Sequence, residues 1–148
     1  MIALGSDHAG FPLKEEIRAW LDENGYEYKD FGVYNTDRAD YPVYGARVAR
    51  AVASGEYEKG ILCCGTGIGI SIAANKVDGI RAACCSDYFS AKYTRAHNDA
   101  NILCMGARVI GGGAACELVN VFLNTGFEGG RHADRIALFK KIENGEEL

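Results

Sequence analysis

The chain has 148 residues, of which 48% are hydrophobic, and this is enough for one domain with a substantial buried core. Its 16 basic and 20 acidic residues give a net charge of -4 without a run of lysine or arginine, so nucleic acid is not expected as a partner. No apolar stretch approaches the roughly 20 residues that span a bilayer, and the amino terminus has no signal-peptide pattern, so we expect a cytoplasmic protein with no membrane partner.

Strands and helices are predicted to alternate along the chain. Short apolar or alternating segments predict strands at 2–5, 26–31, 61–64, 80–85 and 101–105, the last extended loosely toward residue 110. Helical spacing of apolar residues predicts helices from Pro12 to Gly25, from Pro42 to Gly55, over the glycine-rich segment to residue 77, over 87–96, from the glycines at 111–113 to about 124, and over 131–143. This alternation predicts an α/β fold: a three-layer doubly wound (Rossmann-like) five-stranded parallel sheet with a C-terminal helical tail, in a single domain spanning 1–148.

The segment ILCCGTGIGISIAANKV, from Ile61 to Val77, predicts a strand, a tight turn and a helix. Gly65, Gly67 and Gly69 permit left-handed torsions and a close approach of the backbone, so the amides that open the helix could converge on an anion such as phosphate. Cys64 is the last side chain of the strand, where the positive end of the helix should favour a thiolate.

The six cysteines give no sign of zinc or disulfides, because none has CxxC spacing. Most are expected to be reduced core residues, and Cys63, which should face the other side of the strand, is one of them. For Cys64 taken alone, a buried core thiol is also the simpler interpretation. No metal site is predicted.

The glycine-rich turn is a weak match to nucleotide-binding motifs. Ile70 stands where the third glycine of GxGxxG would be, although Asp87 lies near the end of the next strand, where a ribose-binding carboxylate would be. No lysine follows the glycines, as a P-loop requires. The turn is therefore predicted to be an anion site without a nucleotide motif, and no nucleotide cofactor is expected.

Ligands of a doubly wound fold bind at the carboxyl edge of the sheet, where the strand-to-helix turns lie. Asp7, His8, Cys64 and the glycine loop are all predicted at that edge. Asp7 could simply cap a helix near Pro12 and His8 could be a loop histidine, but their place beside the glycine loop favours a functional role.

Motifs along nearly the whole chain closely resemble those of the ribose-5-phosphate isomerase B and galactose-6-phosphate isomerase family. They are GSDHAG at 5–10, DYP at 40–42, CGTGIGISIAANK at 64–76, GIRA at 79–82, HNDANIL at 97–103, GARVIG at 106–111 and EGGRHADR at 128–135. The resemblance implies interconversion of an aldose phosphate and a ketose phosphate without metal or organic cofactor.

The resemblance also implies roles for individual residues. Cys64 is similar to the family's proton-abstracting base and His97 to the group that helps open the sugar ring. One branch of the family carries a glutamate base at the position of Ile70, so this chain resembles the cysteine type. The positions similar to the family's substrate-binding residues are Asp7, His8, the loop Gly65, Thr66, Gly67, Ile68 and Gly69, and Asn98, Arg108, Arg131 and Arg135.

This chemistry needs a base and donors that stabilise the oxygen charge of an enediolate. The loop amides and the Thr66 hydroxyl lie next to Cys64, so the loop is expected to hold the enediolate rather than the phosphate. Arg131 and Arg135, one helical turn apart, would then bind the phosphate. Without the resemblance, the two arginines would be a solvated helix start.

The position of His97 and Asn98 predicts an assembly. They follow a helix that runs back from the carboxyl edge for roughly 15 Å, and should emerge at the amino edge. If His97 acts above Cys64, it must come from a neighbouring chain, which predicts a homodimer or a dimer of dimers with shared sites. Alternatively, His97 only caps its own helix.

Other functions remain open at this point. The substrate could be a 6-phosphohexose, such as allose or galactose 6-phosphate, instead of ribose 5-phosphate. The chain could also be a non-catalytic sugar-phosphate-binding module, or one subunit of a hetero-oligomer. Because Cys64 occurs together with the His97-Asn98 pair, a self-sufficient enzyme is favoured.

Overall fold

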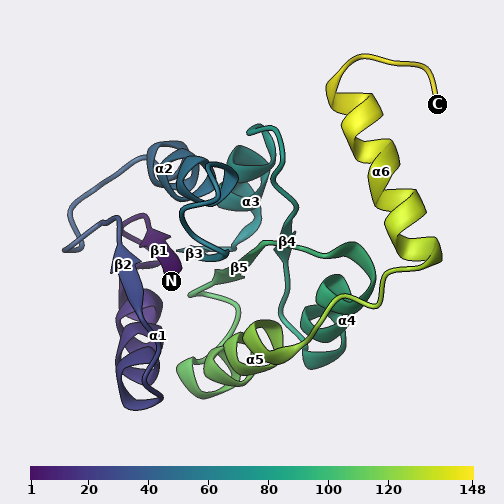
Figure 1. Ribbon diagram of the computed structural model, residues 1–148. Helices are drawn as coiled ribbons and strands as arrows, with labels where there is room; N and C mark the ends of the chain where they lie inside the picture. The colour runs from purple at the N-terminus through teal and green to yellow at the C-terminus, as the bar shows by residue number, and fades with distance from the viewer.

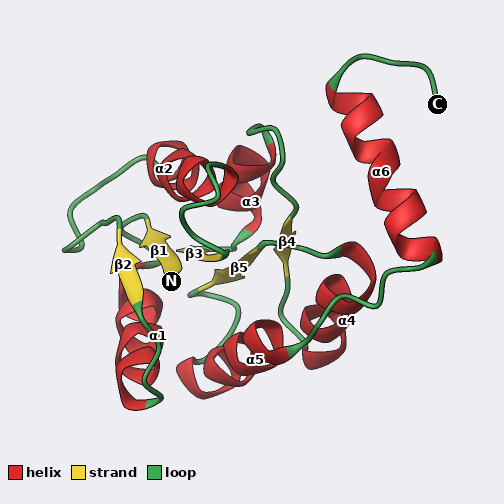
Figure 2. Ribbon diagram, in the orientation of Figure 1, coloured by secondary structure: helices red, strands yellow, loops and turns green.

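The computed structural model describes residues 1–148 and has a five-stranded sheet at its centre (Figures 1 and 2). The strands are β1 (Ile2–Ser6), β2 (Tyr28–Asp30), β3 (Lys59–Cys64), β4 (Ala82–Cys84) and β5 (Ile102–Gly106). They lie in the order β2-β1-β3-β5-β4, and every neighbouring pair is parallel. The predicted doubly wound α/β fold is confirmed.

Helices cover both faces of the sheet. They are α1 (Phe11–Glu23), α2 (Tyr41–Ala53), α3 (Ile68–Asn75), α4 (Tyr88–Asn98), α5 (Gly112–Asn124) and α6 (Arg131–Glu143). Figure 1 shows α2 and α3 on one face, α1, α4 and α5 on the other, and α6 standing apart from the rest. No helix combines the length and apolar character needed to cross a membrane.

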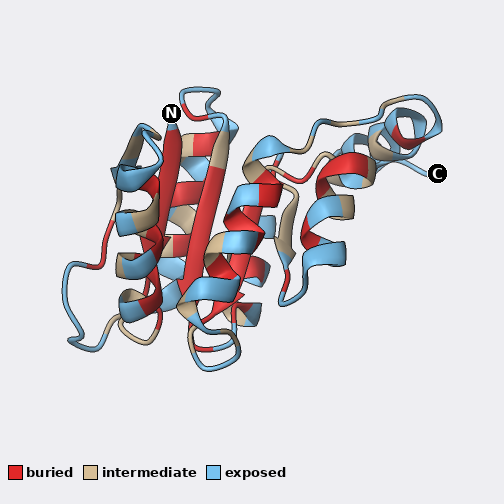
Figure 3. Ribbon diagram, turned by 90° about the horizontal axis from the view of Figure 1, so that it is seen from below, coloured by how far each residue is buried: buried red, intermediate tan, exposed pale blue.

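The core consists of two apolar layers that the sheet separates. β1 and β5 are buried over their full length and β3 over nearly all of it (Figure 3). Side chains alternate between the two faces of a strand, so Cys63 packs in the layer under α1 and α5, whereas Cys64 belongs to the layer under α2 and α3. Cys63 is therefore the buried core thiol that the sequence predicted.

The edge strands and one extension differ from the sequence-based prediction. β2 and β4 have only three residues each, fewer than the predicted segments 26–31 and 80–85. The extension of the last strand toward Ile110 is wrong, because the Gly106 carbonyl accepts hydrogen bonds from the amides of Val109 and Ile110 and closes a turn there. The tail helix begins and ends as predicted, at Arg131 and Glu143.

A buried ion pair fixes the chain after β2. The Lys14 side chain is fully buried in α1, and its ammonium lies 2.7 Å from an Asp30 carboxylate oxygen. Lys14 also donates to the Val33 carbonyl, and Asp30 accepts from the Gly32 amide at 2.8 Å. The loop from 31 to 40 starts at this pair and leads to the backbone of Ala39, which hydrogen-bonds His8.

Removing the acid of this pair should destabilise the fold. Asp30→Ala leaves the Lys14 charge buried without a partner, and such a loss costs about 3–5 kcal/mol of unfolding free energy. Lys14→Met should cost less, because it removes the buried charge itself and its side chain fills similar volume. Urea unfolding at one fixed protein concentration measures both.

The matched control is the partly exposed pair of Arg18 and Glu15, 2.7 Å apart on the same helix. Glu15→Ala should cost roughly 0–1 kcal/mol, as exposed ion pairs do. A loss at Asp30→Ala as small as that at Glu15→Ala would show that the buried pair does not stabilise the fold.

Candidate active site

The site lies where the chain changes direction across the sheet. β1 and β3 are neighbours, the chain proceeds from β1 to β2 on one side, and from β3 it continues to the other side. Their carboxyl ends therefore border the crevice where ligands of such folds bind. A cavity of about 230 Å³ lies there, lined by Asp7, His8, Ala9, Tyr41, Cys64, Gly65, Thr66, Gly69 and Arg108. Most of the predicted site residues thus share one cavity.

Cys64 ends β3 at the floor of this cavity. Its side chain is only 4% exposed, and its sulfur accepts a hydrogen bond from the Gly67 amide at 3.1 Å. Gly67 adopts φ +80° at the start of α3, and a Cβ atom there would lie 2.8 Å from the Met105 carbonyl carbon. Only glycine fits this position, so the turn that aims an amide at the sulfur depends on it.

The other two glycines of the loop serve close approach rather than left-handed torsions. The expectation of left-handed torsions at Gly65 and Gly69 was wrong, since only Gly67 has a positive φ in this loop. A Cβ on Gly65 would lie 3.1 Å from an Arg108 guanidinium nitrogen, and one on Gly69 would lie 2.8 Å from the Tyr41 ring. Both side chains thus lie directly against the loop backbone.

The loop keeps several hydrogen-bond donors unused. The Ile68 amide donates to the Thr66 hydroxyl oxygen at 3.1 Å, and the Gly67 amide donates to Cys64. Four amides around them donate to no acceptor within the chain, namely those of Gly65, Thr66, Gly69 and Ile70. Such free donors at a helix amino terminus bind negative charge well.

Asp7 and His8 lie across the cavity at the end of β1. The buried Asp7 carboxylate accepts a hydrogen bond from the Gly10 amide at 2.9 Å, so it shapes the turn that leads into α1 as well as lining the cavity. His8 Nδ1 lies 3.1 Å from the backbone nitrogen of Ala39. That contact orients the imidazole and leaves Nε2 unpaired within the chain.

Thiols near Cys64 are held in the protonated form by burial. Burial raises the pKa of Cys63 well above its usual value, with the neighbouring Cys64 adding to the effect. Burial likewise raises the pKa of Cys85 to about 11, and that of the exposed-edge Cys84 to a smaller extent. Of the two adjacent cysteines in β3, only Cys64 reaches the cavity.

The remaining predicted residues lie elsewhere. Two residues of the loop do not line the cavity: Gly67, which is buried, and Ile68, which is 56% exposed. His97 and Asn98 end α4, which connects the carboxyl end of β4 to the amino end of β5. They therefore lie toward the amino edge of the sheet, as the topology predicted. Arg131 and Arg135 are exposed on the first turns of α6.

His97 belongs to a second group of side chains that the sequence did not predict. Its ring stacks on that of His132 at 4.2 Å between centroids, with 10° between the planes. One Glu128 oxygen lies 3.5 Å from Nε2 of each histidine. Burial lowers the pKa of His132, and His97 and Arg131 lower it further. The spacing of four between Glu128 and His132 is the only sequence signal for this group.

Sequence reasoning also missed Tyr41 as a site residue. Its ring packs on Gly69 and lines the cavity from the first turn of α2. The available signal was the DYP motif at 40–42, from which no site residue was predicted.

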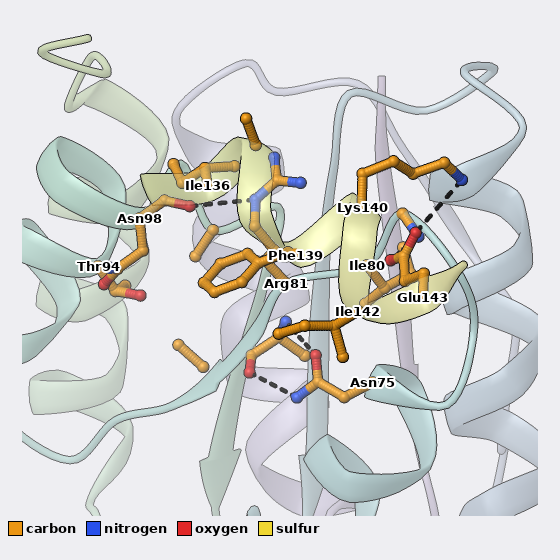
Figure 4. Close-up of a pocket in the computed structure, with 15 residues that line it drawn as sticks. Asn75, Ile80, Arg81, Thr94, Asn98, Ile136, Phe139, Lys140, Ile142 and Glu143 are labelled. Carbon is orange, nitrogen blue, oxygen red and sulfur yellow. Dashed lines mark hydrogen bonds and ion pairs between the residues drawn. The ribbon is translucent and has the colours of Figure 1, made fainter. Parts of the chain in front are cut away.

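The largest cleft, of about 630 Å³, is not the chemical site. It lies between α6 and the β4 edge and has a mostly apolar lining that includes Ile80, Ile136, Phe139 and Ile142 (Figure 4). Its polar groups are largely paired with one another, as Asn75 is with the Ala82 backbone. The smaller cavity is the candidate active site, because it holds the cysteine and the free amides.

Comparison with known proteins finds relatives that match nearly the whole chain. The model of the Ribose/Galactose Isomerase family matches residues 2–139. Ribose-5-phosphate isomerase B of Escherichia coli is 52% identical over 96% of this chain and 95% of its own length. The solved structure of Clostridium thermocellum ribose-5-phosphate isomerase B is 51% identical and has a TM-score of 0.96 over 97% of each chain. A 4-deoxy-4-sulfo-D-erythrose isomerase of Clostridium is 46% identical over 85% of this chain and 80% of its own length.

Proposed function

The chain belongs to the ribose/galactose isomerase family, and on this basis we propose that it interconverts ribose 5-phosphate and ribulose 5-phosphate with Cys64 as the base. The assignment of the base rests on the cavity at the carboxyl ends of β1 and β3. There the Cys64 sulfur lies beside the backbone amides of the glycine loop. Turnover by the purified chain alone tests the activity, because a sugar-phosphate-binding module or a dependent subunit would form no product.

The proposed reaction moves a proton between two neighbouring carbons. The Cys64 thiolate removes the C2 proton of the open aldose, and the electron pair of that bond forms the C1–C2 double bond while the C1 oxygen takes the negative charge. A proton then passes from the C2 hydroxyl to the C1 oxygen, which moves the negative charge to the C2 oxygen. As the ketone forms at C2, the electron pair of the C1–C2 double bond takes the proton back from the Cys64 thiol at C1.

The loop is suited to hold the enediolate oxygens. Three of the four unused amides, those of Gly65, Thr66 and Gly69, belong to residues that line the cavity with Cys64. The Thr66 hydroxyl, which accepts from Ile68, retains its own proton to donate. Each donor of this kind contributes roughly 3 kcal/mol to an oxyanionic transition state in other enzymes. Asp7, His8 and Arg108 surround the same cavity and are placed to bind the sugar.

Ring opening and phosphate binding require groups that lie outside this cavity. His97, with Asn98, is proposed to open the ring, and Arg131 and Arg135 to bind the phosphate in bidentate fashion. Because α4 carries His97 toward the amino edge, these groups would come from a second copy of the chain. The shared site therefore implies a homodimer or a dimer of dimers.

The surface of α6 supports such an assembly. Its apolar stripe is left open in the single chain, with Leu138 at 39%, Phe139 at 42% and Ile142 at 58% exposed. The apolar cleft beneath the helix is open as well. Covering this surface with a second copy would remove it from water, which favours association.

The preferred sugar is proposed from the relatives named ribose-5-phosphate isomerase B. The alternative is a 6-phosphohexose, and a relative named for a four-carbon sulfosugar shows that names within the family differ in both chain length and anionic group. A panel of aldose phosphates of four to six carbons separates these possibilities.

Cys64→Ala should abolish turnover, because it removes the base and leaves the amides in place. Cys63→Ala should keep most of the activity, since that side chain lies in the opposite apolar layer. Alkylation of Cys64 should inactivate the enzyme, and bound substrate should slow the alkylation. Full activity with Cys64 demonstrably alkylated, or equal losses in both variants, would refute the assignment.

Replacing Arg131 or Arg135 by alanine should weaken phosphate binding. Losing one charge-assisted contact costs roughly 1.5–3 kcal/mol, which corresponds to about a 10- to 150-fold loss in kcat/KM for the phosphorylated sugar. The exposed Arg50 on α2 provides a control arginine whose replacement should change nothing. A loss of the same factor on unphosphorylated ribose would make the two arginines structural.

Mixing inactive Cys64→Ala and His97→Ala chains should restore activity if sites are shared. Random subunit exchange makes half of the dimers mixed, each with one intact site, so about a quarter of the parental activity is expected. Native mass spectrometry verifies the exchange. An active monomer, or no recovery after verified exchange, would contradict sharing.

A further inference from the structure

Three potential metal ligands converge beside the end of α4. They are one ring nitrogen each of His97 and His132 and a carboxylate oxygen of Glu128, and these three atoms lie within 4.8 Å of one another. The Glu128 oxygen is 3.5 Å from each histidine nitrogen. Both separations exceed the 2.7–3.2 Å of an N–H···O hydrogen bond, so hydrogen bonding alone does not account for the convergence.

The backbone brings the three side chains together before any ligand binds. His97 lies in the last turn of α4, and the Glu128 amide donates to the Ala96 carbonyl at 3.0 Å, which ties the loop before α6 to that turn. His132 follows four residues after Glu128, and its own amide donates to the Gly129 carbonyl at 3.1 Å. The His132 ring is buried, so its position is fixed by packing.

We propose that His97, Glu128 and His132 form a binding site for a divalent transition-metal ion of the zinc class. Zinc binds imidazole nitrogen and carboxylate oxygen at about 2.0–2.2 Å, so two ligands of a tetrahedral ion lie roughly 3.3–3.5 Å apart. The two distances of 3.5 Å from the Glu128 oxygen already match this separation between ligand atoms. The donor set of two imidazoles and one carboxylate leaves a fourth position for water.

Binding requires a small rearrangement of the rings. A metal ion lies in the plane of each imidazole that binds it, whereas the planes of His97 and His132 are nearly parallel, at 10°. The rings must therefore tilt toward each other. His97 is partly exposed and Glu128 is exposed, so both have room to move. Neither Nδ1 atom has a hydrogen-bond partner within the chain, and lack of such support weakens a site by about 10- to 100-fold.

The ion would bind the imidazole that is proposed to open the sugar ring. A metal on Nε2 of His97 removes the lone pair with which that nitrogen accepts a proton, so the bound ion should inhibit turnover. This consequence rests on the proposed role of His97, whereas the metal site itself does not. Binding and inhibition are therefore measured separately.

Proton NMR of the imidazole rings tests binding directly, because the chain has only three histidines. The third, His8, lies in the Cys64 cavity. On titration with Zn²⁺ in a Cys84→Ser background, which removes the exposed thiol, the signals of His97 and His132 should shift together to saturation. Those of His8 should stay in place, and EDTA should reverse the change.

Glu128→Gln should weaken Zn²⁺ binding at least about tenfold while leaving both rings in the fold, since its side chain is exposed. Glu56→Gln, at another exposed glutamate, is the matched control and should bind as the parent does. A response of His8 equal to that of the other two, no response of either His97 or His132, or unchanged affinity in Glu128→Gln would overturn the site.

In parallel, Zn²⁺ should inhibit turnover of ribose 5-phosphate by the parent and Glu56→Gln over the concentration range in which the NMR signals shift. Glu128→Gln should need about tenfold more ion. If the histidine signals shift as expected but turnover is unaffected, the metal site stands and the inhibition through His97 is refuted. If the proposed isomerase function is wrong, the parent will show no turnover even without metal. The NMR titration still measures metal binding in that case, so the two failures are distinguishable.

Discussion

The close approach of three backbone segments around Cys64 is the constraint on which the site depends. A Cβ on Gly10 would lie 2.2 Å from the Cys63 carbonyl oxygen, and one on Gly106 would lie 2.5 Å from the Thr66 carbonyl carbon. The end of β3 is therefore held between the turn after β1 and the end of β5, without side chains in between. This packing fixes the direction in which the Gly67 amide points at the sulfur. The amides of Gly65, Thr66 and Gly69, residues that line the cavity, have no acceptor within the chain.

The sheet gives two adjacent, chemically identical thiols different environments. Cys63 is completely buried, and burial raises its pKa because an apolar layer does not solvate a thiolate. Cys64 faces the other side, at the point where the strand ends and helix amides begin. The different environments of this pair thus follow from strand alternation and from one residue of difference in position along β3.

The sequence predicts the fold well where local pattern decides the structure. Apolar periodicity located α1 and α6, and strand alternation placed Cys63 and Cys64 on opposite faces. Patterns of apolar residues cannot identify Lys14 as a core residue, because its burial depends on Asp30 across the β1–β2 edge. Tyr41 was missed as a site residue for a related reason, since its role comes from packing on Gly69.

The group formed by His97, Glu128 and His132 depends on a contact that no local pattern encodes, the return of the loop before α6 to the end of α4.

The Cys64 cavity and the group formed by His97, Glu128 and His132 lie apart, and this decides which subunit a ligand of that group would inhibit. The cavity with Cys64 has backbone donors of its own but is not lined by His97, Arg131 or Arg135. Those three residues lie together on α4 and α6. In a shared site, one chain would supply the base and the other the ring-opening and phosphate-binding groups. Glu128 and His132 belong to the same chain as the His97 that they contact. Any ligand of that group would therefore act on the site of the neighbouring subunit, so metal inhibition in a mixed dimer should follow the chain that contributes His97 and be independent of the chain that contributes Cys64.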